Sequence, residues 1–185
     1  MNADAALETV LRGVEPAARL VSERHLRKVL HHLRDNGRAI PANPALPFWI
    51  TRADLADADV LERSVLDGPE QLFLLLTTPD DRMIDSYPPD ERLQEYWRLL
   101  FRGAVLRAID QKLAAGELSV ETCARRLDHY GPWVAREIRF VLESDHVVDP
   151  EADDAARYRA FAAVYLDLLH FRPAMLEDFF PSIAH

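Results

Sequence analysis

Apolar side chains recur every three or four positions along most of this chain, which is the periodicity of helices that bury one face. In the segment 22–37 the apolar stripe consists of Leu26, Val29, Leu30 and Leu33. Ser22 stands where its hydroxyl can accept a hydrogen bond from an unpaired amide at a helix start. Gly37 suits the left-handed conformation that ends many helices. The pattern therefore predicts a helix over 22–37.

The most apolar helix is predicted between about Pro89 and Ala115. Apolar positions cover most of its circumference, and only a narrow polar strip remains, formed by Glu91, Glu95, Arg98, Arg102 and Asp110. A helix of this kind is typically surrounded by other elements. Further helices are predicted before Arg12, over 119–130, from Pro132 to about Asp149, over 155–170 and after Pro173. We therefore expect a mainly α fold, a multi-helix bundle around the central helix near 89–115.

Three segments depart from the helical pattern. Phe48-Trp49-Ile50 follows a proline-rich stretch and predicts a small β element over 48–50. The apolar run 72–76 fits a buried strand as well as a helix, because its length does not distinguish the two. The prolines and aspartates of 77–90 predict a surface loop. We expect a single domain over 1–185, with subdomains 1–78 and 89–185 as its natural division.

The composition narrows the class of protein. Of 185 residues, 49% are hydrophobic and 29% charged, which is typical of globular proteins. Cys123 is the only cysteine. This count excludes an intrachain disulfide and a thiolate zinc cluster, and Cys123 is expected to be a buried, inert thiol. The first residues lack a signal-peptide pattern, and no apolar run reaches the roughly 20 residues of a membrane span. We expect a cytoplasmic protein without a membrane role.

The sequence offers little for catalysis. No two of its six glycines lie within ten residues of each other, which excludes the clustered glycines of phosphate-binding loops. No serine lies between glycines in a nucleophile elbow. We therefore predict a non-catalytic protein, with no catalytic residue and no cofactor. The abundance of Ala, Leu and Asp, with only two lysines, suggests a GC-rich bacterial genome.

An asymmetry in charge and an apolar end point to a protein partner. The net charge is −9, yet residues 22–39 hold five basic and two acidic residues. Such contrast can orient a partner during association. The end of the sequence is unusually apolar, and its candidate partner-binding residues are Leu176, Phe179, Phe180 and Ile183. The leading hypothesis is a protein-interaction or regulatory helical module within a larger bacterial protein or assembly.

Two alternatives from other classes rest on specific residues. The helix 22–37 and the segment up to Ile50 resemble the recognition helix and wing of winged-helix proteins, which bind nucleic acid. The resemblance implies contacts from Arg24, Arg27, Lys28, Arg34 and Arg38, although the net charge of −9 opposes nucleic acid as a partner. The second alternative is a small helical metalloenzyme, because two pairs place a carboxylate and an imidazole one turn apart. Its candidate ligands are Glu143, His146, Asp167 and His170.

Overall fold

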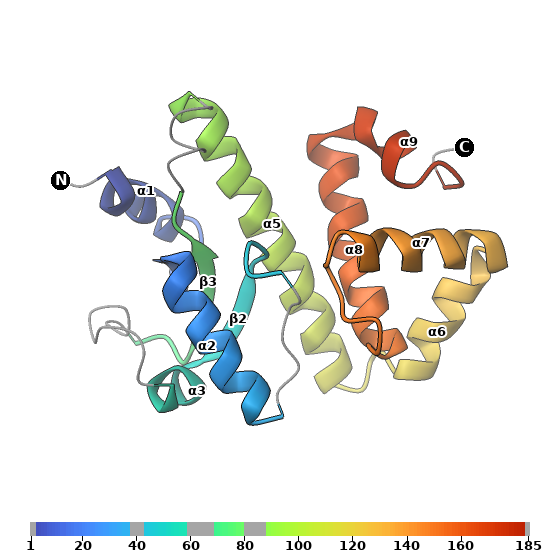
Figure 1. Ribbon diagram of the computed structural model, residues 1–185, viewed down its shortest axis with the longest axis horizontal. Coiled ribbons are helices and arrows are strands. Elements are labelled where there is room, and N and C mark those ends of the chain that lie inside the picture. Colours follow the sequence, from blue (N-terminus) through green and yellow to red (C-terminus); the bar gives the residue numbers. More distant parts are fainter. Residues whose placement is uncertain (1–2, 38–42, 59–68, 80–87, 184–185) are drawn as a thin grey trace. The chain divides into compact units, whose positions relative to one another are not determined.

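The computed structural model describes residues 3–37, 43–58, 69–79 and 88–183. The chain forms two compact units, Met1–Leu100 and Phe101–His185, and the boundary falls inside the long helix α5 (Pro89–Ala114). The fold is mainly α with a small sheet, as the sequence predicts (Figure 1). No helix in the described part of the chain is long and apolar enough to cross a bilayer.

The amino-terminal unit contains a three-stranded sheet of β1 (Ala18–Val21), β2 (Phe48–Thr51) and β3 (Leu72–Thr77). The strand order is β1-β3-β2, with β3 parallel to β1 and antiparallel to β2. The predicted extended segment 48–50 is thus confirmed as β2. The run 72–76, for which the sequence allowed helix or strand, is the central strand.

The position of β3 explains its uninterrupted apolar sequence. Phe73 and Leu75 face a core cluster that includes the apolar stripe of α2 (Glu23–Asp35). Leu74 and Leu76 face the opposite cluster, which contains residues of α1 (Ala3–Arg12) and of the first half of α5. The helices α2 and α5 lie on either face of the sheet in Figure 1. A strand covered on both faces needs apolar side chains at every position, so the alternation typical of half-exposed strands is absent.

Side-chain caps begin two helices of the amino-terminal unit, and the first of them, at Ser22, is the start that the sequence predicts. Ser22 Oγ accepts a hydrogen bond from the amide of His25 at the start of α2. Thr51 Oγ1 accepts one from the amide of Asp54, which begins α3 (Arg52–Asp57) directly after β2. Each cap satisfies an amide that has no partner within its own helix. Short polar side chains thus fix where strand gives way to helix.

The carboxyl-terminal unit is helical: after the second half of α5 come α6 (Val120–His129), α7 (Pro132–Ser144), α8 (Asp154–Phe171), the 3₁₀ turn η2 (Pro173–Met175) and α9 (Leu176–Phe179). Figure 1 shows α9 folding back beside α8. The helices of this unit share a core that consists of Leu127, Ile138, Leu142, Val148, Ala160, Phe161, Val164, Leu168, Leu176 and Phe180.

Helix α7 ends at Ser144, before the Asp149-Pro150 stop that the sequence indicated. His146 adopts a left-handed conformation with φ 53°. The carbonyl of Leu142 then accepts hydrogen bonds from the amides of Val147 at 2.8 Å and Val148 at 3.3 Å. This arrangement satisfies the helix end without a proline, so the early termination follows from local backbone bonding.

Arginine–aspartate ion pairs join α5 to α8 inside the carboxyl-terminal unit. Arg102 Nη2 lies 2.6 Å from Asp167 Oδ2, and the Asp167 side chain is fully buried. Arg159 Nη1 lies 2.8 Å from Asp110 Oδ1, and both of these side chains are more than a third exposed. The two pairs have the same chemistry but differ in burial, which makes them a natural comparison for the cost of removing a charge.

Candidate functional site

The apolar end of the chain is part of the core of its own unit. Leu176 and Phe180 are buried, and Phe179 and Ile183 are half-buried against the same cluster. The Phe180 ring meets the Phe161 ring edge to face, with centroids 5.4 Å apart. The packing accounts for these apolar residues without a partner, so they do not form the exposed patch that motivated them as a binding site.

The basic residues of α2 lie on its solvent side. Arg24, Arg27, Lys28 and Arg34 are exposed, while the apolar stripe packs on the sheet. Arg27 Nε donates to Glu23 Oε1 at 2.9 Å, so part of this positive charge is paired within the helix. Arg38, the remaining candidate for nucleic-acid contact, lies outside the described residues.

The four candidate metal ligands do not converge. Asp167 is held in the buried ion pair with Arg102. His170 is exposed and lies edge-on to Phe101, with ring centroids 5.4 Å apart. His146 is exposed at the end of α7, and Glu143 lies in that helix's last turn. Within the described residues, no group of three or more His, Cys, Asp or Glu is placed to hold a metal ion.

Cys123 is fully buried on the inner side of α6. Burial raises the pKa of its thiol, while the nearby charge of Arg126 lowers it. At pH values between the ordinary thiol pKa and the raised pKa of Cys123, the folded chain keeps a proton that the unfolded chain releases. A rise in pH through this range therefore weakens folding.

We expect Cys123 to react with a disulfide reagent at pH 8 more slowly in the native protein than in the urea-unfolded protein. The expected ratio of the two rates is on the order of 100 or more. The reaction must wait for the core to open and form a thiolate. Release of the coloured thiolate reports the rate, and equal rates in the folded and unfolded protein would refute this expectation.

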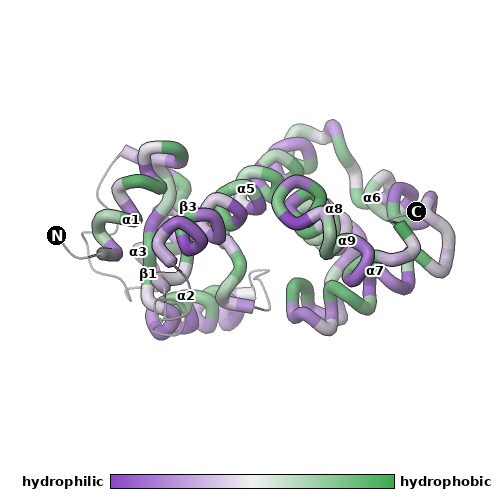
Figure 2. Tube along the Cα trace, turned by 90° about the horizontal axis from the view of Figure 1, so that it is seen from above, coloured by the Kyte–Doolittle hydropathy of each residue, from purple (hydrophilic) through white to green (hydrophobic). Residues whose placement is uncertain are grey.

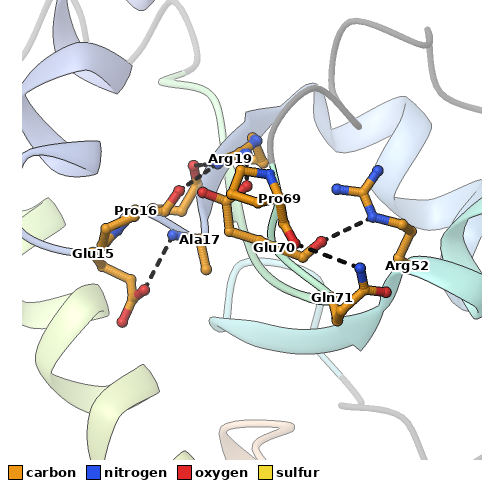
Figure 3. Close-up of polar contacts among 9 residues, drawn as sticks. Glu15, Pro16, Ala17, Arg19, Arg52, Pro69, Glu70 and Gln71 are labelled. Atoms are coloured by element: carbon orange, nitrogen blue, oxygen red, sulfur yellow. Dashed lines mark hydrogen bonds and ion pairs between the residues drawn. The ribbon is translucent and has the colours of Figure 1, made fainter.

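A buried arginine organises the edge of the amino-terminal sheet (Figure 3). Arg19, in β1, is 1% exposed, and its Nη1 donates to the carbonyls of Pro16 at 2.7 Å and Ala18 at 2.8 Å. Its Nη2 donates to Glu70 Oε2 at 3.3 Å. The guanidinium lies 4.9 Å from the centre of the Phe73 ring, which is a cation–π contact. Burial is the main cause that lowers the pKa of Arg19, although an arginine stays charged.

The surroundings of Arg19 are those of a structural group. Arg52 Nε donates to the carbonyl of Glu70 at 2.8 Å, and its guanidinium lies 5.0 Å from the Phe73 ring centre. Arg19 and Arg52 thus lie near one ring and bind one residue of the segment before β3. Because Arg19 and Arg52 both donate hydrogen bonds to Glu70, the cluster holds that segment against the sheet.

One face of α7 exposes two large aromatic rings. Trp133 is 75% exposed and Phe140 is 68% exposed. They stand seven positions apart, so they share a side of the helix. The Arg136 guanidinium between them lies 5.5 Å from the Trp133 ring centre. Hydrophobic and hydrophilic segments alternate along α7 in Figure 2. Trp133, Arg136 and Phe140 are called the α7 face below.

An open groove of about 450 Å³ lies beside α6. Its lining shares a basic and aromatic character, with no carboxylate among the described residues that form it: Thr122, Arg125, Arg126, His129, Tyr130 and Tyr158. The first four stand at positions i, i+3, i+4 and i+7, which is one side of a helix. Tyr158 comes from α8, and Tyr130 packs edge-on to Phe161 of α8, with centroids 6.0 Å apart. This set is called the α6 groove.

The Arg126 side chain is positioned at the groove by Tyr158. Its Nη1 donates to the Tyr158 hydroxyl at 2.6 Å, and the guanidinium lies 5.4 Å from that ring's centre. Arg125 Nη2 donates to Thr122 Oγ1 at 3.1 Å. Arginine carries five N–H donors, so these contacts leave each side chain with donors for a further acceptor.

Neither surface was among the residues expected from the sequence. For α7, a signal was present: the inward stripe contains Val134, Ile138 and Leu142, and Trp133 and Phe140 fall off it. Aromatic rings on the outer side of an amphipathic helix are the pattern that identifies such a face. The α6 groove has no comparable signal, since Tyr158 meets Arg126 only after α6 packs on α8.

Comparison of the chain with protein-family models, with curated proteins and with solved structures gave no match.

Proposed function

We propose that this chain is a non-catalytic protein-interaction module of a larger bacterial assembly in the cytoplasm, and that it binds its partner through the α7 face. The observation that carries the proposal is the exposure of Trp133 and Phe140 on one side of α7. Tryptophan and arginine are enriched among the residues that dominate binding energy at interfaces, and an exposed aromatic cluster marks an interaction site.

The exposed area of Trp133 and Phe140 is large enough to contribute substantially to the free energy of binding. Large aromatic side chains bury roughly 150–250 Å² each, and burial contributes about 25 cal/mol per Å². Covering the exposed parts of Trp133 and Phe140 thus contributes on the order of 5 kcal/mol before the costs of association. Helix α7 is already held by its inner stripe and by Glu137, which accepts hydrogen bonds from Ser182. The face is therefore presented on a fixed element, which limits the ordering cost.

The charges of α7 favour an acidic partner. Arg136 and Arg139 are exposed, whereas the carboxylate of Glu137 is bonded to Ser182 at 2.6 Å. The outer side of α7 therefore presents two cations near the apolar rings against the one carboxylate of Glu143 in its last turn, although the whole chain carries −9. Complementary charge of this kind accelerates and orients association. An acidic segment with apolar side chains fits the α7 face best.

Capture from a host lysate tests the proposal, with the full chain as bait and nuclease present. We expect a stoichiometric protein partner to be retained by the parent chain. The double variant Trp133→Ala with Phe140→Ala should lose it by at least about 100-fold in affinity, because two anchors of this type are each worth about 2 kcal/mol. Val14→Ala, which shortens an exposed apolar side chain in the amino-terminal unit, is the matched control and should retain it.

The stability of the double variant separates a binding defect from misfolding. Both rings are exposed, so their removal should change the free energy of unfolding by no more than about 0.5 kcal/mol each. A partner that binds the double variant as tightly as the parent chain would contradict the proposal.

Nucleic-acid binding by α2 is the second candidate, favoured by the exposure of Arg24, Arg27 and Lys28 on one side of the helix. The capture experiment, repeated without nuclease, distinguishes nucleic-acid binding by α2 from protein binding by the α7 face. Nucleic acid retained without nuclease, and lost both at high salt and in Arg24→Ala with Lys28→Ala, would support this candidate over the α7 face.

A further inference from the structure

The α6 groove combines two kinds of recognition group that the α7 face does not use. Its polar groups are cationic or neutral donors, from Arg125, Arg126 and Thr122, together with the imidazole of His129. The groove is also lined by Tyr130 and Tyr158. In a chain of net charge −9, a cluster of donors free of lining carboxylates among the described residues requires an explanation.

The donors match an oxyanion with several acceptor oxygens. Arginine guanidinium groups bind phosphate through pairs of parallel N–H bonds, and Arg125 and Arg126 are neighbours on α6. The hydrogen bond from Arg126 to the Tyr158 hydroxyl fixes one guanidinium at the groove before any ligand arrives. Such preorganisation lowers the entropy lost on binding.

The rings match a planar aromatic group attached to that oxyanion. Tyrosine side chains stack with nucleobases of any sequence, because each base presents a π face. Tyr130 is 46% exposed, so much of its surface is available to a ligand. A volume of about 450 Å³ lies within the range of small-molecule sites, above what a lone phosphate requires.

We infer that the α6 groove binds a nucleoside monophosphate, with Arg125 and Arg126 on the phosphate and the tyrosine rings against the base. The assignment is independent of the α7 face, because the two surfaces share no residue. It adds a small-molecule ligand to a chain proposed to bind a protein.

Titration calorimetry of the full chain with adenosine, guanosine, cytidine and uridine monophosphates tests the inference, with inorganic phosphate and adenosine as the separated halves. We expect at least one nucleotide to bind about tenfold tighter than either half, since one base stack contributes roughly that factor. Amide chemical shifts should move in α6 and around Tyr158.

Variants then locate the site. Arg125→Ala with Arg126→Ala should weaken the nucleotide at least tenfold. Tyr130→Leu, which replaces the 46% exposed ring and leaves the Arg126–Tyr158 contact in place, should remove the advantage of the nucleotide over phosphate. Arg12→Ala, an exposed arginine of α1, is the control and should leave binding unchanged. Circular dichroism checks that each variant is folded, and the single change Arg125→Ala at an exposed position replaces the double variant if that one unfolds.

Three results would overturn the inference. They are the absence of binding by all four nucleotides at millimolar concentration, binding of phosphate as tight as that of any nucleotide, and nucleotide binding that the groove variants leave intact. A nucleotide-binding result of either sign leaves the capture test of the α7 face unaffected, so the two proposals fail separately.

Discussion

Replacing Arg102 with alanine is expected to lower the free energy of unfolding of the carboxyl-terminal unit by about 3–5 kcal/mol. The variant removes the guanidinium that lies 2.6 Å from Asp167, whose side chain is fully buried. A buried carboxylate that loses the Arg102 cation retains the cost of desolvation and loses the attraction of that pair. Urea unfolding of the full chain, followed by circular dichroism, measures the change.

Arg159→Ala is the matched control, because it breaks a second arginine–aspartate pair between α5 and α8. Both side chains of that pair are partly exposed, so the expected loss is below about 1 kcal/mol. Arg102→Met combined with Asp167→Leu should recover most of the stability, since replacing both buried charges by apolar groups is often neutral. Equal losses for Arg102→Ala and Arg159→Ala would show that burial does not set the cost.

Replacing Phe180 with alanine is expected to cost about 3–5 kcal/mol, the range for removing a buried phenylalanine ring from a core. Phe180 is fully buried and meets Phe161 edge to face, so the change removes both apolar contacts and an aromatic pair. The half-buried Phe179 should cost less when replaced by alanine. Thermal unfolding of the three proteins gives the order.

Phe140→Ala provides the control with the same side chain in an exposed position. At 68% exposure, its loss should change stability by no more than about 0.5 kcal/mol. If Phe180→Ala also proved harmless to folding, the end of the chain would not be held in the core, and the residues Leu176, Phe179, Phe180 and Ile183 would regain their place as a candidate binding surface.

Local signals in the sequence predicted most of the helices and the β2 strand. Ser22 identifies the start of α2 because a cap depends only on residues two or three positions away. The strand β3 could not be assigned in this way. Its apolar run becomes a strand because β1 and β2 pair with its two edges and helices cover its two faces, and each of these partners is distant in sequence.

The candidate sites also divide into those that the sequence indicates and those that depend on tertiary structure. The outward position of Trp133 and Phe140 follows from helical periodicity once the inner stripe of α7 is known. The burial of Phe180 was not readable, because an apolar helix face looks the same whether it packs on its own unit or on another protein. The α6 groove depends on the meeting of Arg126 with Tyr158, which only tertiary structure provides.

The sheet and the helical unit differ in the distance along the chain over which their contacts form. The parallel pairing of β1 with β3 brings Ala18 beside Leu74, so most of the amino-terminal unit must be looped out before this ladder closes. In the carboxyl-terminal unit, α6, α7 and α8 follow one another with short connections and pack on their neighbours. Closing long loops costs entropy before any contact is gained, and folding slows as contacts become less local. Of the two units, the amino-terminal one is therefore expected to have the larger barrier to folding. Its apolar strand β3 stays exposed to solvent until that late pairing forms.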